Sequence, residues 1–366
     1  MNGWMFYVNI CTIACLIVVF MLGKLRLLSL VWLYYLQKKH EPATGVSVVI
    51  CTRNDLKNLQ QNLPFILAQK YSTYEVVVVD DASEDETWPY LQGLAATHPH
   101  LKPVHVSQKT QAGKKWALQK GIEQATYPFI LVTDADCKPV SGEWIHSHAG
   151  FIQEQPMVVL GYGAYKKEKG WLNLLIRFDT AYIASQYMSK ALWKYPYMGV
   201  GRNMGYAKTL ADNLVDIDTR IASGDDDLFV QAITRKAHFM VNIEKQSFTE
   251  SPAKKTWKLW LAQKGRHTTT APQYGFLTQA GIMIQWLAST GVYMGCLLML
   301  IAGEAYTALT LLMLNALSII LFNGLWFSKL GEKDIILLAP LLDFIYTFVQ
   351  PIFVVKSWGR KKEEWN

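Results

Sequence analysis

Hydrophobic residues follow two patterns along the chain, with long uncharged runs near both ends and short β-branched runs between them. Residues Trp4 to Leu22 carry no charge, and Glu304 is the only charged residue from Gly275 to Phe327. As helices, runs of this length cross about 30 Å of hydrocarbon. We therefore predict one membrane span near the start of the chain and two later spans that meet near Gly303 and Glu304.

Charges beside these runs predict their orientation. Four basic residues follow the first run, whereas a cleaved signal peptide carries positive charge before its apolar run. These residues are Lys24, Arg26, Lys38 and Lys39. We expect an uncleaved anchor whose C-terminal side is cytoplasmic, in a bacterial inner membrane.

A further apolar stretch, from Ile335 to Val355, contains Pro340, Asp343 and Pro351. If it spans the membrane, the basic residues that follow it lie outside the cell, against the positive-inside tendency. A re-entrant or interfacial segment would suit the two prolines and the aspartate. Both interpretations stay open.

The middle of the chain alternates short β-branched runs with helical stretches, and this pattern predicts an α/β fold. Helical stretches are expected near residues 56–69 and 114–124. The expected strands are 46–51, 75–80, 103–106 and 129–133. We predict a parallel sheet covered on both faces, with ligands at the carboxyl ends of its strands.

A nicotinamide-dinucleotide site would need a G-x-G-x-x-G motif after the first strand. That strand instead ends in Cys51-Thr-Arg-Asn-Asp55, and Gly199-Val-Gly-Arg-Asn-Met-Gly205 has the wrong spacing and neighbourhood. These observations exclude a dinucleotide-binding domain.

The patterns together predict three regions. Residues 1–36 form an anchor and interfacial helix, residues 37–274 a cytoplasmic catalytic domain, and residues 275–366 C-terminal membrane helices with a basic tail. Residues Trp171 to Trp193 are amphipathic at helical spacing. They form either a helix packed in the core or one that lies on the membrane surface.

Composition narrows the class of protein. Hydrophobic residues make up 51% of the chain and charged residues 18%, which excludes disorder and makes a purely soluble enzyme a poor fit. The net charge of +7 fits an anionic partner such as a membrane surface, a nucleotide diphosphate or nucleic acid. Five cysteines show no metal-ligand spacing and indicate reduced thiols.

Acidic pairs follow two of the predicted strands. Asp134-Ala-Asp136 ends one strand, where two carboxylates reach a single hard cation such as Mg²⁺ or Mn²⁺. Asp80-Asp81 ends another, where a carboxylate can accept hydrogen bonds from a nucleobase or ribose. Solvated turns are the alternative for both pairs, although the position of Asp134 and Asp136 after a buried strand favours a metal site.

Basic residues occur at two places that suit anion binding. Gly113-Lys114-Lys115 opens a helix, and phosphate binds at helix N-termini. Arg266 could neutralise a diphosphate, and His267 could stack on a sugar ring. A solvated turn and a basic segment beside the membrane are the respective alternatives.

A third acidic motif, Ser223-Gly-Asp-Asp-Asp-Leu228, precedes a helical stretch. Neighbouring carboxylates raise one another's pKa, so that one of them is suited to act as a base. Helix capping is the alternative, but three successive aspartates exceed what a cap needs.

Taken in order, these motifs resemble the membrane-anchored family 2 glycosyltransferases of GT-A fold, which include cellulose, chitin and hyaluronan synthases and ceramide glucosyltransferase. The resemblance extends from about Val46 to His267. It rests on Thr-Arg-Asn-Asp, Asp-Asp, Gly-Lys, Asp-x-Asp, the acidic cluster and a Q-x-x-R element, followed by membrane helices.

The resemblance implies a role for each matching residue. It implies binding of the nucleotide-sugar by Thr52, Asp55, Asp80, Asp81, Lys114 and Arg266. It implies metal binding by Asp134 and Asp136, and a catalytic base at Asp225 or, one residue on, Asp226. Acceptor contacts are implied for Arg202, Asn203, Gln263 and His267.

Two departures from the family pattern affect the expected reaction. Gly224 replaces the glutamate of the family's T-E-D, and His267 stands where Q-x-x-R-W has a tryptophan. In the polymer synthases that tryptophan stacks on the acceptor sugar, so its absence favours transfer of a single sugar.

We therefore expect a metal-dependent, inverting transferase that moves a sugar from a nucleotide-diphospho-sugar, by family habit a UDP-sugar, to a lipid or lipid-linked acceptor. A processive polysaccharide synthase and a non-catalytic nucleotide-sugar-binding subunit are the alternatives. We expect no nucleic-acid partner, because the basic residues are spread along the chain instead of being clustered with aromatics.

Overall fold

The computed structural model describes residues 3–36, 39–107, 114–152, 156–214, 224 and 226–357. Its contacts divide the chain into two compact units, which we call the helical unit and the sheet unit. Of the described residues, those in 3–34, 167–189 and 255–357 make up the helical unit. Those in 35–166 and 190–254 make up the sheet unit. The three regions expected from the sequence stay a prediction.

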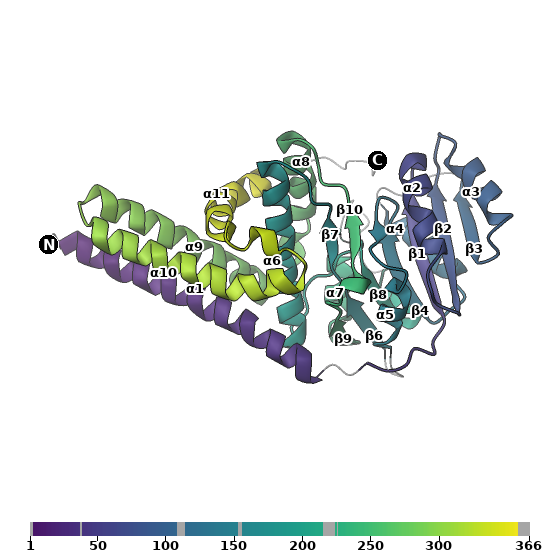
Figure 1. Ribbon diagram of the computed structural model, residues 1–366, viewed down its shortest axis with the longest axis horizontal. Helices are drawn as coiled ribbons and strands as arrows, with labels where there is room; N and C mark the ends of the chain where they lie inside the picture. The colour runs from purple at the N-terminus through teal and green to yellow at the C-terminus, as the bar shows by residue number, and fades with distance from the viewer. Residues whose placement is uncertain are drawn as a thin grey trace. The chain divides into compact units, whose positions relative to one another are not determined.

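The sheet unit contains a seven-stranded sheet with strand order β3-β2-β1-β4-β8-β6-β9 (Figure 1). Its strands are β1 (Val46–Thr52), β2 (Tyr74–Asp81), β3 (Leu101–Val106), β4 (Phe129–Asp134), β6 (Met157–Leu160), β8 (Met204–Ala207) and β9 (His238–Val241). A small second sheet has the order β5-β10-β7, from β5 (Lys138–Pro139), β7 (Gly163–Tyr165) and β10 (Thr249–Ser251).

The α/β fold and its first four strands are confirmed, but the main sheet is not parallel throughout. Strands β3, β2, β1 and β4 run parallel, whereas β8 lies antiparallel to both β4 and β6. Strand β8 follows α6 (Trp171–Leu192) in the chain and lies between β4 and β6 in the sheet. Its carbonyl and amide groups pair with β4 from Phe129 to Val132.

Helices cover both faces of the parallel strands because alternate side chains of a strand point to opposite faces. On one face, β1 contributes Val46, Val48 and Ile50 to a core shared with α2 (Leu56–Leu67), α3 (Thr87–Ala95) and α5 (Trp144–Ala149). On the other face, α4 (Lys115–Gln124) packs through Gly121, where an added Cβ would lie 2.6 Å from Val49. The predicted covering of both faces is therefore confirmed for these strands.

Two short helices complete the sheet unit. The 3₁₀ helix η1 (Lys208–Leu214) follows β8, and α7 (Asp227–Ile233) precedes β9. Another 3₁₀ turn, η2 (Lys245–Ser247), lies between β9 and β10.

The helical unit is built mainly from long apolar helices. Its elements are α1 (Gly3–Leu36), α6, α8 (Trp257–Thr268), η3 (Ala271–Gln273), α9 (Phe276–Ile301), α10 (Ala305–Lys329), η4 (Lys333–Ile335) and α11 (Ala339–Ser357). Among the described residues, α1, α9, α10 and α11 are long and apolar enough to cross a membrane. The expected break between two spans is present, because Gly303 adopts φ +86° between α9 and α10.

Helices α1, α9 and α10 lie side by side in the helical unit (Figure 1). Small residues allow α1 and α9 to approach closely: a Cβ added at Gly291 would lie 2.5 Å from Cys15 Sγ. One added at Gly295 would lie 1.9 Å from Thr12 Oγ1. This spacing is the small-xxx-small pattern of membrane helix pairs.

Helix α6 is held by a buried ion-pair network in the same unit. Arg177 pairs with Glu332, and its Nη2 lies 2.7 Å from both carboxylate oxygens of Asp334. Most side chains of α6 are buried, although Trp171 is exposed. The structure thus favours the interpretation of residues 171–193 as a packing helix over a helix lying on the membrane surface.

Candidate functional site

The carboxyl ends of β1 and β2 place two buried polar side chains next to each other. Thr52 and Asp80 are direct neighbours in the parallel register, and both are almost fully buried. Thr52 Oγ1 and Asp80 Oδ1 have no hydrogen-bond partner among the described residues. Because a buried polar atom without a partner costs free energy, the pair indicates a place where a bound group would supply hydrogen bonds. Asp81, next to Asp80, is also buried.

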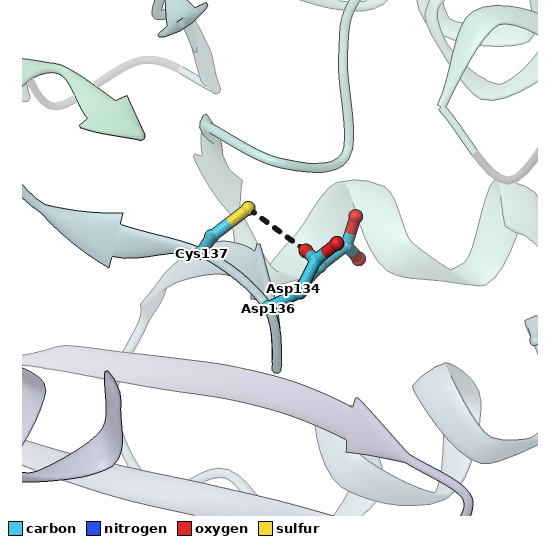
Figure 2. Close-up of side chains that lie close together, drawn as sticks. All are labelled: Asp134, Asp136 and Cys137. Atoms are coloured by element: carbon cyan, nitrogen blue, oxygen red, sulfur yellow. Dashed lines mark hydrogen bonds between the residues drawn. The ribbon is translucent and has the colours of Figure 1, made fainter. Parts of the chain in front are cut away.

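The carboxyl end of β4 carries the predicted metal-binding pair. Figure 2 shows the carboxylates of Asp134 and Asp136 close together, with the thiol of Cys137 directed at Asp136. Ligand atoms of these three residues lie within 4.8 Å of one another, and Cys137 Sγ donates to Asp136 Oδ1 at 3.4 Å. The side chains therefore converge closely enough to contact one ion.

Two cations balance these carboxylates. The Lys114 ammonium, at the start of α4, forms an ion pair with Asp134. Arg202 lies over the ring of Tyr165, 4.3 Å from its centroid, and its Nη1 donates to Ser251 Oγ at 3.0 Å. Burial acts to lower the pKa of Arg202, but Tyr165, Cys137 and Asp136 together raise it above its ordinary value. Both cations are suited to an anionic ligand such as a diphosphate.

The acidic side chains at this edge repel one another. Burial and the charge of Asp134 raise the pKa of Asp136, and nearby Arg202 only partly offsets the effect. Burial raises the pKa of Asp55 to about 6. A hydrogen bond from Asn58 acts to lower this pKa, whereas the charges of Asp136, Asp85 and Asp134 act to raise it. A divalent cation would relieve this repulsion, so the electrostatics of the site favour cation binding.

The donor set fits a hard divalent cation. Carboxylate oxygens are the ligands that Mg²⁺ and Mn²⁺ prefer. Burial and the charge of Asp136 raise the pKa of the Cys137 thiol well above its ordinary value. Since the protonated thiol is a poor ligand, Asp134 and Asp136 are the residues that would hold the ion.

The acidic motif is only partly described. Asp225 lies outside the described residues. Asp226 caps α7: its Oδ1 accepts from the amide of Asp227 at 2.8 Å, and its Oδ2 accepts from the amide of Gly201 at 3.0 Å. Asp226 thus connects this motif to the loop that carries Arg202.

Asn203 has a clear structural function. Its side-chain amide donates to the carbonyls of Tyr162 and Ser247, and its Oδ1 accepts from Trp144 Nε1 at 3.0 Å. These bonds hold the buried loop before β8, and acceptor contact by Asn203 stays a prediction.

Gln263, Arg266 and His267 lie on α8 in the helical unit. Thr256 caps this helix by accepting from the amide of Leu259 at 3.3 Å. The other described site residues belong to the sheet unit, so the roles expected for these three stay predictions.

Sequence reasoning missed two polar residues near this edge of the sheet. His105 Nδ1 lies 2.9 Å from Asp80 Oδ2, and its ring stacks on Trp88 with centroids 4.6 Å apart. Arg53, after Thr52, has buried Nε and Nη1 atoms without a hydrogen-bond partner among the described residues. The rule that singled out Asp80, a polar residue near a strand's carboxyl end, also applies to His105.

Comparison with known proteins agrees with this arrangement. Residues 47–215 match the model of Glycosyl transferase family 2. A poly-beta-1,6-N-acetyl-D-glucosamine synthase of Staphylococcus epidermidis is 27% identical over 100 residues, which cover 27% of this chain and 24% of that protein. An uncharacterized glycosyltransferase of Haemophilus influenzae is 24% identical over 155 residues, 42% of this chain and 44% of that protein. The chain thus matches less than half the length of these relatives.

The likeness to a solved structure extends over more of the chain than the likeness to these relatives. A mannosyltransferase from Pyrobaculum calidifontis, in complex with GDP-Man and Mn²⁺, aligns with 94% of this chain and 99% of its own. The TM-score is 0.59 and the sequence identity 17%.

The sheet, its acidic strand ends and these likenesses define a nucleotide-sugar transferase fold of the GT-A type. More specifically, residues 47–215 match the family 2 glycosyltransferase model, and the resemblance drawn from the motifs is confirmed.

Proposed function

We propose that this chain transfers a single sugar from a nucleotide-diphospho-sugar to a lipid or lipid-linked acceptor at a membrane. The observation that carries the proposal is the acidic pair Asp134 and Asp136 beside Lys114 and near Arg202, at the carboxyl edge of a family 2 sheet. This edge is where α/β sheets bind ligands.

The donor would be held at both of its ends. Asp80, Asp81, Thr52 and Asp55 would contact the nucleoside. A divalent cation on Asp134 and Asp136 would neutralise charge on the leaving diphosphate. Lys114, and by resemblance Arg266, would add positive charge there, and stabilisation of this kind lowers the barrier most in a site that excludes water.

We assign the catalytic base to Asp225. It would take the proton of the acceptor hydroxyl as that oxygen bonds to the anomeric carbon and the bond from that carbon to the diphosphate oxygen breaks. Attack from the face opposite the leaving group inverts the configuration. Asp226 is the less suitable base because both of its carboxylate oxygens accept backbone hydrogen bonds.

A membrane acceptor is supported by the four helices, in the described part of the chain, that are able to span a membrane. We place the catalytic domain on the cytoplasmic side of a bacterial inner membrane, because basic residues follow the first span. His267, in place of the tryptophan of the polymer synthases, supports a single transfer.

A processive polysaccharide synthase is the second candidate. It is favoured by the likeness to a poly-beta-1,6-N-acetyl-D-glucosamine synthase, which covers about a quarter of that relative.

The test is nucleotide release by the full chain purified in detergent. We would supply UDP- and GDP-sugars with Mn²⁺ or Mg²⁺, with and without membrane lipid extract. Asp225→Asn should reduce release by at least about 100-fold, the usual contribution of a general base, while nucleotide binding persists. Asp212→Asn, on η1, is the matched control and should behave as wild type.

The outcomes separate the candidates. Release that needs lipid extract and gives a lipid product with one added sugar supports the proposal, whereas a ladder of longer products supports the synthase. Nucleotide binding without release from any donor would indicate a non-catalytic subunit and would refute the proposal.

A further inference from the structure

Helices α1 and α9 of the helical unit run in opposite directions. Thr12 of α1 lies opposite Gly295 of α9, and Cys15, further along α1, lies opposite Gly291. A later position on α1 thus matches an earlier position on α9. The end of α1 therefore lies level with the beginning of α9.

Helix α10 runs in the same direction as α1. Near the beginning of both helices, the Asn9 amide donates to Glu304 Oε2 at 3.1 Å. Near their ends, Trp326 Nε1 donates to the carbonyl oxygen of Arg26 at 2.9 Å. One end of this three-helix bundle thus consists of the end of α1, the beginning of α9 and the end of α10.

Polar side chains mark a membrane boundary at that end of the bundle. Residues 4–23 of α1 carry no charge and extend over about 30 Å, the thickness of a hydrocarbon core. Charged residues follow, among them Arg26. Arg26 lines a cavity together with Gln285 of α9, Asn323 of α10 and Asp343 of α11. Asp343, near the beginning of α11, therefore lies at the level of this boundary.

The last turns of α11 pack against α8. A Cβ added at Gly265 of α8 would lie 3.2 Å from the backbone carbonyl carbon of Lys356. Phe353 packs edge-to-face on the buried Trp260, with ring centroids 5.3 Å apart. Helix α8 precedes α9 with only the short turn η3 between them. The end of α11 thus lies beside an element that is attached to the same end of the bundle.

Helix α8 is too polar to lie in hydrocarbon. It carries Lys258, Lys264 and Arg266, and charged side chains within a bilayer are costly. Asp343 and Lys356 are about 20 Å apart along the axis of α11. Both nevertheless lie at the same boundary, because one shares a cavity with Arg26 and the other contacts α8.

The direction and the surface of α11 agree with this placement. Figure 1 shows α11 nearly end-on, whereas α1, α9 and α10 extend across the same view. The buried side of α11 includes the polar residues Asp343, Tyr346 and Thr347. The other side exposes an apolar surface at helical spacing, which we call the α11 stripe and which consists of Leu341, Phe344, Phe348, Ile352 and Val355.

We propose that α11 lies in the plane of the membrane at its cytoplasmic boundary, with the α11 stripe against the acyl chains of one leaflet. Helices of this kind bury their apolar face by about 5–10 Å. Among the described helices, α1, α9 and α10 are then the membrane spans. The basic residues after α11 stay on the same side as those after α1, in agreement with the positive-inside tendency.

The inference goes beyond the proposed reaction and rests only on the proposed membrane placement. It also gives α11 a function, because the helix that carries the Q-x-x-R element packs on it. Helix α11 holds α8 at the membrane surface, where a lipid acceptor would meet it.

The first test measures the depth of nitroxide labels on the full chain in lipid nanodiscs. Single cysteines are labelled in a background in which Cys11 and Cys15 are replaced by alanine. Depth follows from the accessibility of each label to oxygen and to a water-soluble nickel complex. Labels at Leu341→Cys, Phe348→Cys and Val355→Cys should report equal depths in one leaflet. A label at position 348 that lies deeper than the other two would show a spanning or re-entrant helix and would overturn the inference.

The exposed side of α10 provides the matched control. Labels at Leu309→Cys, Leu317→Cys and Leu325→Cys should show the profile of a span, with position 317 deepest. Equally high access of the nickel complex to all three would show that α10 does not cross the membrane. That result would overturn the proposed membrane placement together with the inference.

The second test compares the two ends of the chain in the same cysteine-depleted background. Three spans place the ends on opposite sides of the membrane, whereas four place them on the same side. A membrane-impermeant maleimide should label one of Asn2→Cys and Asn366→Cys in intact bacterial cells, and both after lysis. Labelling of both or of neither in intact cells, with both reactive after lysis, would overturn the inference. The nucleotide-release test of the proposed function is independent of either result.

Discussion

The residue that most clearly ties pH to folding is His148 on α5. Its side chain is fully buried, and Nδ1 lies 3.0 Å from the carbonyl oxygen of Trp144. Burial lowers the pKa of His148 to about 4, and the charge of Lys39 acts in the same direction. The imidazole is therefore neutral in the folded chain at neutral pH.

Acid should destabilise the sheet unit, because His148 takes up a proton more readily in the unfolded chain than in the folded chain. The unfolded chain binds a proton below about pH 6.5, whereas the folded chain does so only near pH 4. The free energy of unfolding thus falls as the pH drops through this window, by up to about 3 kcal/mol. Hydrogen exchange of peptides from α5, measured from pH 7 to 4.5 and corrected for intrinsic rates, should show the loss. In His148→Gln the pH dependence should be flatter, and an equal slope in both proteins would contradict this account.

Single residues were predictable where one strand is enough to place them. Asp80 and Asp134 each end a buried hydrophobic run. Because ligands bind at the carboxyl ends of parallel strands, this position alone indicates that both residues belong to the site. The contact of His105 with Asp80 depends instead on the register of β2 against β3, and its stacking on Trp88 depends on where α3 begins. Neither is encoded in a local pattern. The role of Asp225 rests on resemblance alone.

At the scale of elements, four strands and their helices were predictable because long β-branched runs alternate with amphipathic stretches. Strand β8 was not, because Met204–Ala207 is only four residues long and contains a glycine. Its antiparallel pairing joins segments far apart in the chain, and the bonds of Asn203 to Tyr162 and Ser247 hold the loop before it, so neither follows from a local pattern.

The contact between α1 and α9 gives an element-scale prediction. A side chain at Gly295 would meet Thr12, so Gly295→Ile must push the helices apart. We expect a loss of about 1–3 kcal/mol of stability, as for overpacked interiors. The measurement is the thermal unfolding midpoint in detergent.

Met294→Ile is the matched control, because Met294 is exposed on the same helix. Thr12→Ala should partly restore Gly295→Ile by making room for the new side chain. Equal midpoints for Gly295→Ile and Met294→Ile would show that the close approach of the helices does not contribute to stability.

At the scale of the whole molecule, the chain combines a region that matches the family 2 glycosyltransferase model with helices able to span a membrane. The long uncharged runs predicted the helices that are able to span a membrane, because an apolar run of about 20 residues is typical of a membrane span. The helical unit also includes α6 and α8, whose sequences are less apolar than the spans. Their inclusion depends on contacts such as the pairing of Arg177 with Glu332, which the sequence pattern does not reveal.

The central claim is that Asp134 and Asp136 bind a nucleotide diphosphate through a divalent cation. The most direct measurement is calorimetric binding of UDP to the full chain in detergent, with Mn²⁺ and after chelation. Wild type should bind only with the metal, and Asp136→Asn should weaken binding at least about tenfold because it removes one charged ligand. Asp212→Asn should bind as wild type. Undiminished UDP binding after chelation and in Asp136→Asn would contradict the account.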